Sequence, residues 1–369
     1  MIPVENMASR RNTWLRRQFL SGIATTVFPR SIPLLGAGPG QNTELAGTDM
    51  DVSSAQSLVT PNQRFFIRNH FKTPLIRADD WRLSVTGRFH SSLEIGYQEV
   101  LKLPKRSITV TVECAGNGVG GGAISTATWT GIPLFELLNQ AGLEPGVRFL
   151  RLTGRDQGTA ETASEPIPYA RSIPIDKALH PDTILAFAMN GVPLPAEHGF
   201  PLRAIVPGWY GMDSVKWLVS IEALGHQDLS HFMTERYVAT RLLAVGTERR
   251  PLSRMHVKSQ ITSPREGERL PLRAYVIRGA AWAGESEVSQ VEVAVDGGRL
   301  WARAELEAPP QPYRWVLWKY VWPPPGFGKY TVVARATDAQ GRTQPATKDH
   351  LRFDQYENDW YHGVRCEVL

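Results

Sequence analysis

The chain has 369 residues, of which 42% are hydrophobic and 21% charged, and a formal net charge of +5. This length exceeds what one hydrophobic core usually serves and favours about two domains. The charge is modest, and no basic run alternates with aromatic residues, which excludes a nucleic-acid-binding surface of the usual kind. Nowhere do about 18 apolar residues follow one another, so we expect no membrane span in the mature protein.

The N-terminal segment has the pattern of an export signal. Arg16 and Arg17 directly precede a short, weakly apolar stretch from Phe19 to Phe28, which resembles a twin-arginine signal. A basic tail without a targeting role is the alternative interpretation. We assign residues 1–57 to a signal and leader, and expect a periplasmic or extracytoplasmic protein.

The next segment, residues 58–249, is predicted to form an α+β domain. Short β-type runs cover Trp81–Val85, Ser107–Val112 and Phe149–Leu152, and Pro133–Ala141 has a helical pattern. The pattern changes near Arg249–Leu252, where strands take over.

Residues 250–369 are predicted to form an all-β sandwich of immunoglobulin-like type. Val288–Val295 and Lys329–Ala336 alternate apolar and polar residues, and Asp296–Gly298 supplies turn residues between strands. Such a domain can be purely structural, and we expect it to carry a dimer interface rather than chemistry.

Cys114 is the residue on which the functional interpretation depends. It lies in the run Thr111–Gly118, where a β-type stretch ends in small residues, and the other cysteine is Cys366 near the C-terminus. Two cysteines placed so far apart exclude a disulfide framework and a cysteine-rich zinc site. A buried, inert thiol is the plainer interpretation. The alternative is a single thiolate that binds a soft metal.

Further motifs accompany Cys114 in a fixed order. The chain contains Phe66–His70 upstream of it, and Glu197–Arg203, Val206–Gly208, Ser214–Leu218 and Tyr356–Trp360 downstream. Together with Cys114–Asn117 these segments resemble the sulfite oxidase family of molybdopterin enzymes, from about Asn62 to the C-terminus. The resemblance implies a molybdopterin-binding catalytic domain followed by a dimerisation domain.

The resemblance also implies a cofactor and a set of site residues. The cofactor would be molybdenum-molybdopterin, with Cys114 as the thiolate ligand of the metal. Because such a cofactor is inserted into a nearly folded protein, export of a folded cargo suits this family. The positions that match the family's cofactor contacts are Phe66, Ile67, Arg68, Asn69, His70, Asp156, His198, Arg203, Ser214, Val215 and Lys216.

Two residues are expected to act on the substrate besides Cys114. Tyr237 matches the family's active-site tyrosine, and its phenol would donate a hydrogen bond near the metal. Arg68 would pair its side chain with the charge of an anionic substrate.

The chain departs from vertebrate and plant sulfite oxidases on the substrate side of the site. Gly118–Gly122 replaces a segment that carries a second arginine and a tryptophan there, and Glu285–Glu287 stands where a basic residue is expected. A pocket with fewer arginines would bind a dianion such as sulfite less tightly, or admit a larger substrate. Three interpretations therefore stay open. The chain is a sulfite dehydrogenase, or a binding protein without metal, or the same scaffold acting on another sulfur substrate, as a sulfur dehydrogenase subunit of a thiosulfate-oxidising system or as a sulfoxide reductase.

Electron transfer requires a partner. The chain lacks a Cys-x-x-Cys-His motif, which excludes covalent haem, and the region before Asn62 is too short for a haem domain. We expect an external c-type cytochrome, or a haem subunit, as the electron acceptor. The resemblance further implies a homodimer formed through the sandwich.

Overall fold

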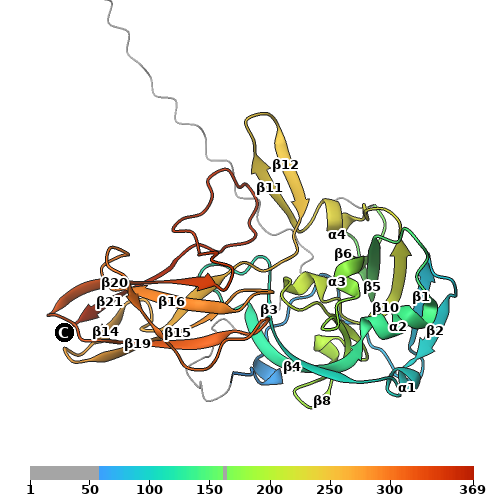
Figure 1. The fold of residues 1–369 in the computed structure, drawn as a ribbon, viewed down its shortest axis with the longest axis horizontal. Coiled ribbons are helices and arrows are strands. Elements are labelled where there is room, and N and C mark those ends of the chain that lie inside the picture. The colour runs from blue at the N-terminus through green and yellow to red at the C-terminus, as the bar shows by residue number, and fades with distance from the viewer. Residues whose placement is uncertain (1–57, 161–163) are drawn as a thin grey trace, which may run out of the picture. The chain divides into compact units, whose positions relative to one another are not determined.

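Two β-sheets frame the first part of the chain in the computed structural model, which describes residues 58–160 and 164–369 (Figure 1). The first sheet pairs β1 with β10 in parallel and its other neighbours antiparallel. Its strands, in spatial order, are β2 (Leu93–Gly96), β1 (Arg82–Gly87), β10 (Leu218–Leu224), β5 (Phe149–Gly158) and β6 (Ile167–Pro174).

The second sheet carries the residues that lead into Cys114. Its strands are β3 (Arg106–Glu113), β4 (Ile124–Pro133), β7 (Ile184–Met189) and β8 (Val192–Pro193), with β9 (Arg203–Ile205) paired to β7. Strands β3 and β4 run antiparallel, with Glu113 opposite Ile124. The ten-residue connection between them contains Cys114 and the glycine-rich segment that follows it.

Helices in this part of the chain are short. The longest is α2 (Leu134–Ala141), which buries Leu134, Leu137, Leu138 and Ala141 on one face at the spacing expected of an amphipathic helix. The others are α1 (Tyr97–Val100), α3 (Ile175–Ala178) and α4 (His231–Thr234), with 3₁₀ turns η1 (Asn62–Arg64), η2 (Ala196–His198) and η3 (Gly211–Asp213).

The C-terminal part is a sandwich of two antiparallel-rich sheets around its own apolar cluster. One sheet contains β13 (Lys258–Ser263), β15 (Tyr275–Trp282), β19 (Val316–Trp322) and β18 (Glu305–Leu306). The other contains β14 (Glu268–Leu270), β21 (His362–Val368), β20 (Gly328–Asp338), β16 (Val288–Ala294) and β17 (Ala302–Arg303). In β16, Val291 and Val293 are buried as the alternation in the sequence predicts, and Val288 is buried on the other side of a register shift between Val288 and Gln290.

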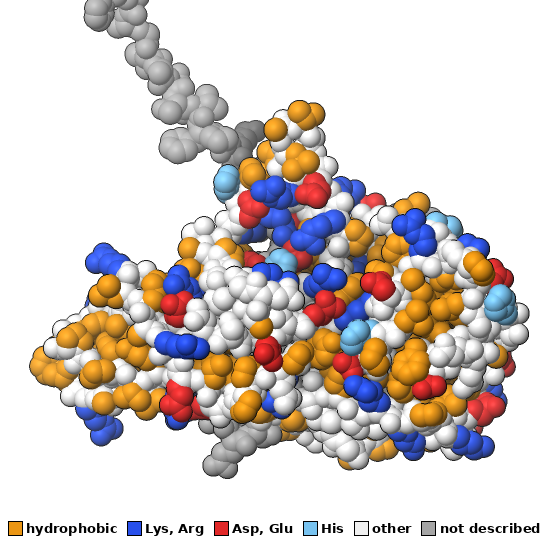
Figure 2. Space-filling model, in the orientation of Figure 1, with side chains coloured by type: hydrophobic (Ala, Val, Ile, Leu, Met, Phe, Trp, Pro, Cys, Tyr) orange, Lys and Arg blue, Asp and Glu red, His pale blue; other side chains and the backbone are white. Residues whose placement is uncertain are grey.

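A β-hairpin projects from the rest of the described chain (Figure 1). It consists of β11 (Val238–Leu242) and β12 (Thr247–Pro251), and it begins directly after Tyr237. Figure 2 shows hydrophobic side chains gathered at its tip, where Leu242, Leu243 and Val245 are exposed. The predicted change of pattern at residues 249–252 thus falls on a strand of this hairpin.

The predicted α+β domain and β-sandwich are confirmed, and the predicted helix and strands lie within a few residues of the observed ones. No helix of the described residues is both long and apolar enough to cross a membrane. The predicted export signal lies outside the residues that the structure describes.

Helix α2 should be an essential part of the first core. Leu138 is fully buried there, so we expect Leu138→Ala to lower the free energy of unfolding by about 2 to 5 kcal/mol. Leu300 is 79% exposed and is the matched control. Leu300→Ala should change the free energy of unfolding by less than about 0.5 kcal/mol. Urea denaturation measures both, and equal effects would contradict the assigned core.

Candidate molybdenum cofactor site

Cys114 presents its thiol to a cavity at the end of strand β3. Its backbone N–H donates to the Ala123 carbonyl (2.9 Å), and its own carbonyl accepts from the Asn117 N–H (2.8 Å), so a tight turn holds the residue. The empty space of the cavity, including its mouth, is about 630 Å³. Burial raises the pKa of the Cys114 thiol, although a backbone hydrogen bond from Gly116 opposes the shift. A metal cation would therefore bind this sulfur by displacing its proton.

Three cationic side chains face the same cavity from separate elements. Arg68 comes from the segment after η1, Arg203 from β9, and Lys216 from the stretch before β10. Among residues 58–160 and 164–369, none of the three forms an ion pair with a carboxylate. Burying a charge without a counter-charge is costly, so this wall is suited to an anionic ligand.

Arg203 and Lys216 are held by backbone carbonyls and aromatic rings rather than by acids. The guanidinium of Arg203 donates to the Ser214 and His198 carbonyls at 3.2 and 3.3 Å, and lies 5.0 Å from the Trp129 ring centre. Lys216 donates to the Glu197 carbonyl (2.9 Å) and to the Asn69 side chain. Burial lowers the pKa of Arg203 to about 10 and that of Lys216 well below its ordinary value.

Gly199 allows these two cations to approach each other. Its φ is +114°, and a Cβ atom there would lie 3.1 Å from the Cβ atoms of both Arg203 and Lys216. A side chain is strained at this backbone angle and would meet both neighbours. Gly199 therefore leaves room for Arg203 and Lys216 at this point of the cavity wall.

Asp156 supplies a carboxylate to the cavity wall. It lies in a stretch of β5 where the pairing with β6 shifts register between Thr153 and Gln157. Among the described residues, its buried Oδ1 atom has no hydrogen-bond partner, and burial raises the pKa of Asp156 to about 6. An acceptor left without a partner in a buried wall fits a ligand with N–H donors, such as a pterin.

Tyr237 and His70 form a hydrogen-bonded pair beside Cys114. The His70 Nε2 atom contacts the Tyr237 hydroxyl, and the His70 ring stacks on Tyr169 with centres 4.5 Å apart. Burial, followed by the charge of Arg68, lowers the pKa of His70 well below its ordinary value, so its imidazole is neutral near pH 7. Burial raises the pKa of Tyr237, which stays a protonated donor.

The structure brings most of the predicted residues to this one cavity. Its wall contains Phe66, Arg68, Asn69, His70, Cys114, Asp156, His198, Arg203, Ser214, Lys216 and Tyr237. The side chains of Ile67 and Val215 do not line it, and Val215 packs in the core of the first domain. The predicted cofactor contacts of these two residues would come from their backbone and stay predictions.

Several wall residues were not predicted. Phe65, Tyr169, Met212 and Trp217 also line the cavity. Trp217 lies inside the Ser214–Leu218 motif, directly after Lys216, so the motif could have predicted its place on the wall. Tyr169 could not be found this way, because contacts with distant segments hold it at the site: its ring stacks on His70, and its hydroxyl donates to the Met212 carbonyl at 2.7 Å.

The acidic replacement at position 285 lies outside the cavity. Glu285 accepts from Lys177 (2.6 Å) and from the Trp209 indole (3.0 Å), and its second oxygen pairs with Arg254 at 2.9 Å. Lys177 also donates to the Pro207 carbonyl at 2.8 Å. Glu285 is thus engaged by its own cluster and contributes no charge to the cavity wall.

His198 should make the cofactor-free protein sensitive to acid. Burial, aided by the charge of Arg203, lowers the pKa of His198 from 6.5 to about 4. Between these values the unfolded chain binds the proton and the folded protein does not, so stability is lost as the pH falls through this window. From pH 7 to pH 5 this residue should cost about 2 kcal/mol. His198→Gln should remove that part of the loss in urea denaturation, and an unchanged pH dependence would contradict the assignment.

Comparisons with known proteins agree with this geometry. The family model of the oxidoreductase molybdopterin binding domain matches residues 70–232, and that of the Mo-co oxidoreductase dimerisation domain matches residues 249–368. Mitochondrial sulfite oxidase of Homo sapiens is 35% identical over 325 residues, which cover 79% of this chain and 58% of that protein. The chain thus spans less than two thirds of the length of that relative.

Other relatives and one solved structure extend the match. Sulfite oxidase of Gallus gallus is 34% identical over 79% of this chain and 69% of its own length. Inducible nitrate reductase (NADH) 1 of Glycine max is 30% identical over 82% of this chain and 39% of its own length. The crystal structure of the sulfane dehydrogenase SoxCD from Paracoccus pantotrophus has a TM-score of 0.76 at 27% identity, covering 94% of this chain and 92% of that chain. With the cavity described above, these matches show that the chain belongs to the sulfite oxidase family of molybdopterin-binding oxidoreductases.

Proposed function

We propose that this protein oxidises sulfite to sulfate and passes the electrons to an external c-type cytochrome. The observation that carries the proposal is the placement of Cys114, Tyr237 and the cations Arg68, Arg203 and Lys216 around one cavity. A bound molybdenum-pterin cofactor supplies oxygen-atom transfer and accepts two electrons. The chain's own residues then have to hold this cofactor and orient an anionic substrate.

The cavity wall divides the task between two groups. Arg203 and Lys216, together with the acceptor Asp156, suit the phosphate and the pterin of the cofactor. Arg68 and Tyr237 lie on the side of Cys114 and suit the substrate: Arg68 offsets its negative charge, and the Tyr237 hydroxyl donates a hydrogen bond to it. His70 is neutral and orients that hydroxyl.

A second candidate substrate is a bound or larger sulfur compound. This chain has the C-terminal sandwich. The solved structure that it matches over 92% of that structure's chain is a sulfane dehydrogenase. In addition, the cluster of Glu285 with Lys177 leaves that segment without a free cation for a dianion. The glycine-rich segment Gly118–Gly122, which supplies no arginine to the site, likewise favours a substrate other than free sulfite.

The partners and location form part of the same proposal. The dimerisation domain over residues 249–368 supports a homodimer. The paired arginines Arg16 and Arg17 support export by the twin-arginine route to the periplasm. A soluble cytochrome in that compartment would serve as the electron acceptor.

Loading with cofactor should depend on Arg203. The guanidinium is 5% exposed and has no carboxylate partner among the described residues, so Arg203→Met should reduce molybdenum and pterin content at least about tenfold. Arg106, whose exposed side chain pairs with Asp182 on the outer end of β3, is the control, and Arg106→Met should load normally. Metal analysis by mass spectrometry measures both, and full loading of Arg203→Met would contradict the assigned role.

Turnover should require Cys114 and Tyr237. With molybdenum-loaded protein we expect sulfite-dependent reduction of ferricytochrome c, which Cys114→Ser abolishes and Tyr237→Phe lowers about a hundredfold in kcat. Tyr330 in the sandwich, which donates to the Gly326 carbonyl, is the control, and Tyr330→Phe should leave the rate unchanged. Loaded protein that is inactive with sulfite but active with thiosulfate or a persulfide would replace the first candidate with the second. Protein that binds no molybdenum with all motifs intact would contradict both.

A further inference from the structure

A buried carboxylate stands next to the thiol but outside the cavity. Glu113, the last residue of β3, is 1% exposed and does not line the cavity. Its Oε1 accepts from the Lys258 ammonium at 2.6 Å, and its Oε2 accepts from the Trp282 indole at 2.9 Å. Both partners belong to the C-terminal sandwich, on strands β13 and β15. Each carboxylate oxygen of Glu113 is thus held from the second domain.

The same carboxylate is connected to the turn that holds the thiol. The Asn117 amide donates to Glu113 Oε1 at 3.1 Å, and its oxygen accepts from the Ala123 N–H at 3.0 Å. The Asn117 backbone N–H donates to the Cys114 carbonyl at 2.8 Å. A continuous chain of hydrogen bonds therefore runs from Lys258 through Glu113 and Asn117 to Cys114.

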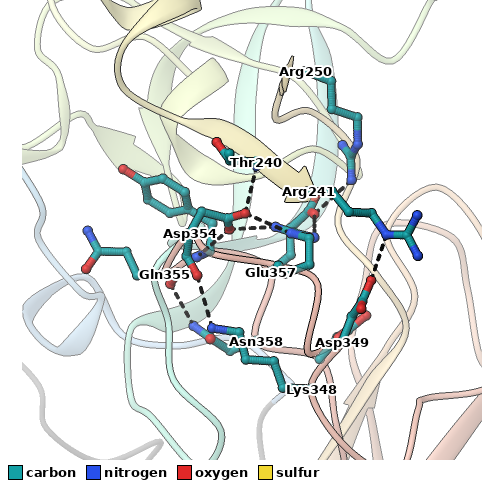
Figure 3. A network of polar contacts seen from close by, with 12 residues as sticks. Thr240, Arg241, Arg250, Lys348, Asp349, Asp354, Gln355, Glu357 and Asn358 are labelled. Atoms are coloured by element: carbon teal, nitrogen blue, oxygen red, sulfur yellow. Dashed lines mark hydrogen bonds and ion pairs between the residues drawn. The ribbon is translucent and has the colours of Figure 1, made fainter. Parts of the chain in front are cut away.

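A loop of the C-terminal domain binds the other side of this turn. The Glu357 N–H donates to the Ala115 carbonyl at 3.0 Å, and the Asn358 amide donates to the Asn117 carbonyl at 3.1 Å. Figure 3 shows how Glu357 is fixed in turn, because its carboxylate accepts from Arg250 of the hairpin. Arg352 donates to the same oxygen at 2.7 Å.

Strand β3 is also bound by the second domain at Thr111. The Thr111 N–H donates to the Tyr313 carbonyl, and the Trp315 N–H donates to the Thr111 hydroxyl, both at 2.8 Å. Next to this contact, Ile124 of β4 packs in an apolar cluster with Ala280, Trp282, Trp315 and Leu317. The second domain thus contacts the strand before Cys114 and the strand after it.

The Glu113–Lys258 pair has features that a general domain contact does not need. Lys258 is 4% exposed, so both charges are removed from water and each depends on the other for compensation. At most contacts between domains, charged groups lie at the solvent-exposed rim rather than in the buried centre. A buried ion pair in which both carboxylate oxygens accept hydrogen bonds holds its side chains in one geometry. Here that geometry fixes the position of Glu113, the residue directly before Cys114.

We propose that Lys258 and Trp282 of the C-terminal domain are positioning residues for Cys114, acting through Glu113 on the turn that presents the thiol. This rests on the proposed function only in that Cys114 is the thiolate ligand of the cofactor. The sandwich then has a part in the metal centre and is more than a dimer interface. Groups that orient a ligand of a metal also tune the electronic properties of that metal.

Hydrogen exchange of backbone amides tests the proposal directly in the full-length protein, with or without cofactor. We expect Lys258→Met to speed exchange at the amides of Cys114, Asn117 and Ala123 at least about tenfold, since it leaves Glu113 buried without its counter-charge. Arg335→Met removes a more exposed ion pair of the sandwich, the 2.8 Å contact of Arg335 on β20 with Glu292 on β16, and should change these three amides by less than twofold. Mass spectrometry of peptides that span residues 110–125 gives the rates.

The second readout is the Mo(V) electron paramagnetic resonance spectrum of partly reduced, loaded protein. We expect altered g values in Lys258→Met and the unaltered spectrum in Arg335→Met. Unchanged exchange at the three amides overturns the proposal, as does an equal rise across the whole sandwich, which would indicate general destabilisation. Faster exchange with an unaltered spectrum overturns the claim that the turn of Cys114 transmits the effect of Lys258 to the metal.

Trp282→Phe keeps the proposal testable if Lys258→Met does not fold. It removes one hydrogen bond to Glu113 and retains an aromatic ring in the apolar cluster, and the same local rise in exchange is expected, at about threefold. Both readouts are independent of substrate. A protein that fails to oxidise sulfite but shows these changes contradicts the proposed substrate and leaves the positioning role intact.

Discussion

The cost of burying positive charge without a counter-charge is the constraint on which the site depends. Arg68, Arg203 and Lys216 face one cavity, and no carboxylate pairs with them in the described part of the chain. Removing a single ion from water costs several kcal/mol even after the protein relaxes. The fold tolerates this cost by giving Arg203 and Lys216 backbone carbonyls and aromatic faces as partners. An anionic cofactor completes the compensation, which explains why the cations are placed so close together.

This constraint shapes the surrounding backbone. Gly199 has a positive φ so that Arg203 and Lys216 can approach, and the shifted pairing of β5 turns Asp156 toward the cavity. Tyr237 also has a positive φ, of 55°, just before the hairpin begins. Such backbone angles are uncommon in non-glycine residues and gather at functional sites. The two domains then meet at the turn of Cys114, where the sandwich supplies four side chains or backbone groups from Lys258, Trp282, Glu357 and Asn358.

The sequence predicted the parts of the site that depend on short runs of residues. Cys114, His198, Arg203 and Lys216 lie in motifs whose order is enough to place them together. Strand alternation likewise predicted β16 and β20 of the sandwich to within a few residues. A motif does not tell which of its side chains point inward, and the cavity wall contains the side chains next to Ile67 and Val215 rather than these two.

The parts that the sequence did not predict depend on contacts between distant segments. Tyr169 is held at the site by stacking on His70 and by a hydrogen bond to the Met212 carbonyl. Glu113 and Lys258 are 145 residues apart, and each alone has the appearance of an ordinary surface charge. The sandwich was accordingly expected to be structural, and only the tertiary packing shows that it contacts the turn of the thiol. Burial and pairing are properties of the folded chain, and local patterns do not report them.

The most direct measurement of the central claim is X-ray absorption at the molybdenum edge of the purified protein. The account predicts that the metal has the Cys114 sulfur among its neighbours, so that the spectrum of Cys114→Ser shows one fewer sulfur neighbour at the same molybdenum content. An identical sulfur count in the two proteins would contradict the assignment of Cys114 as the ligand.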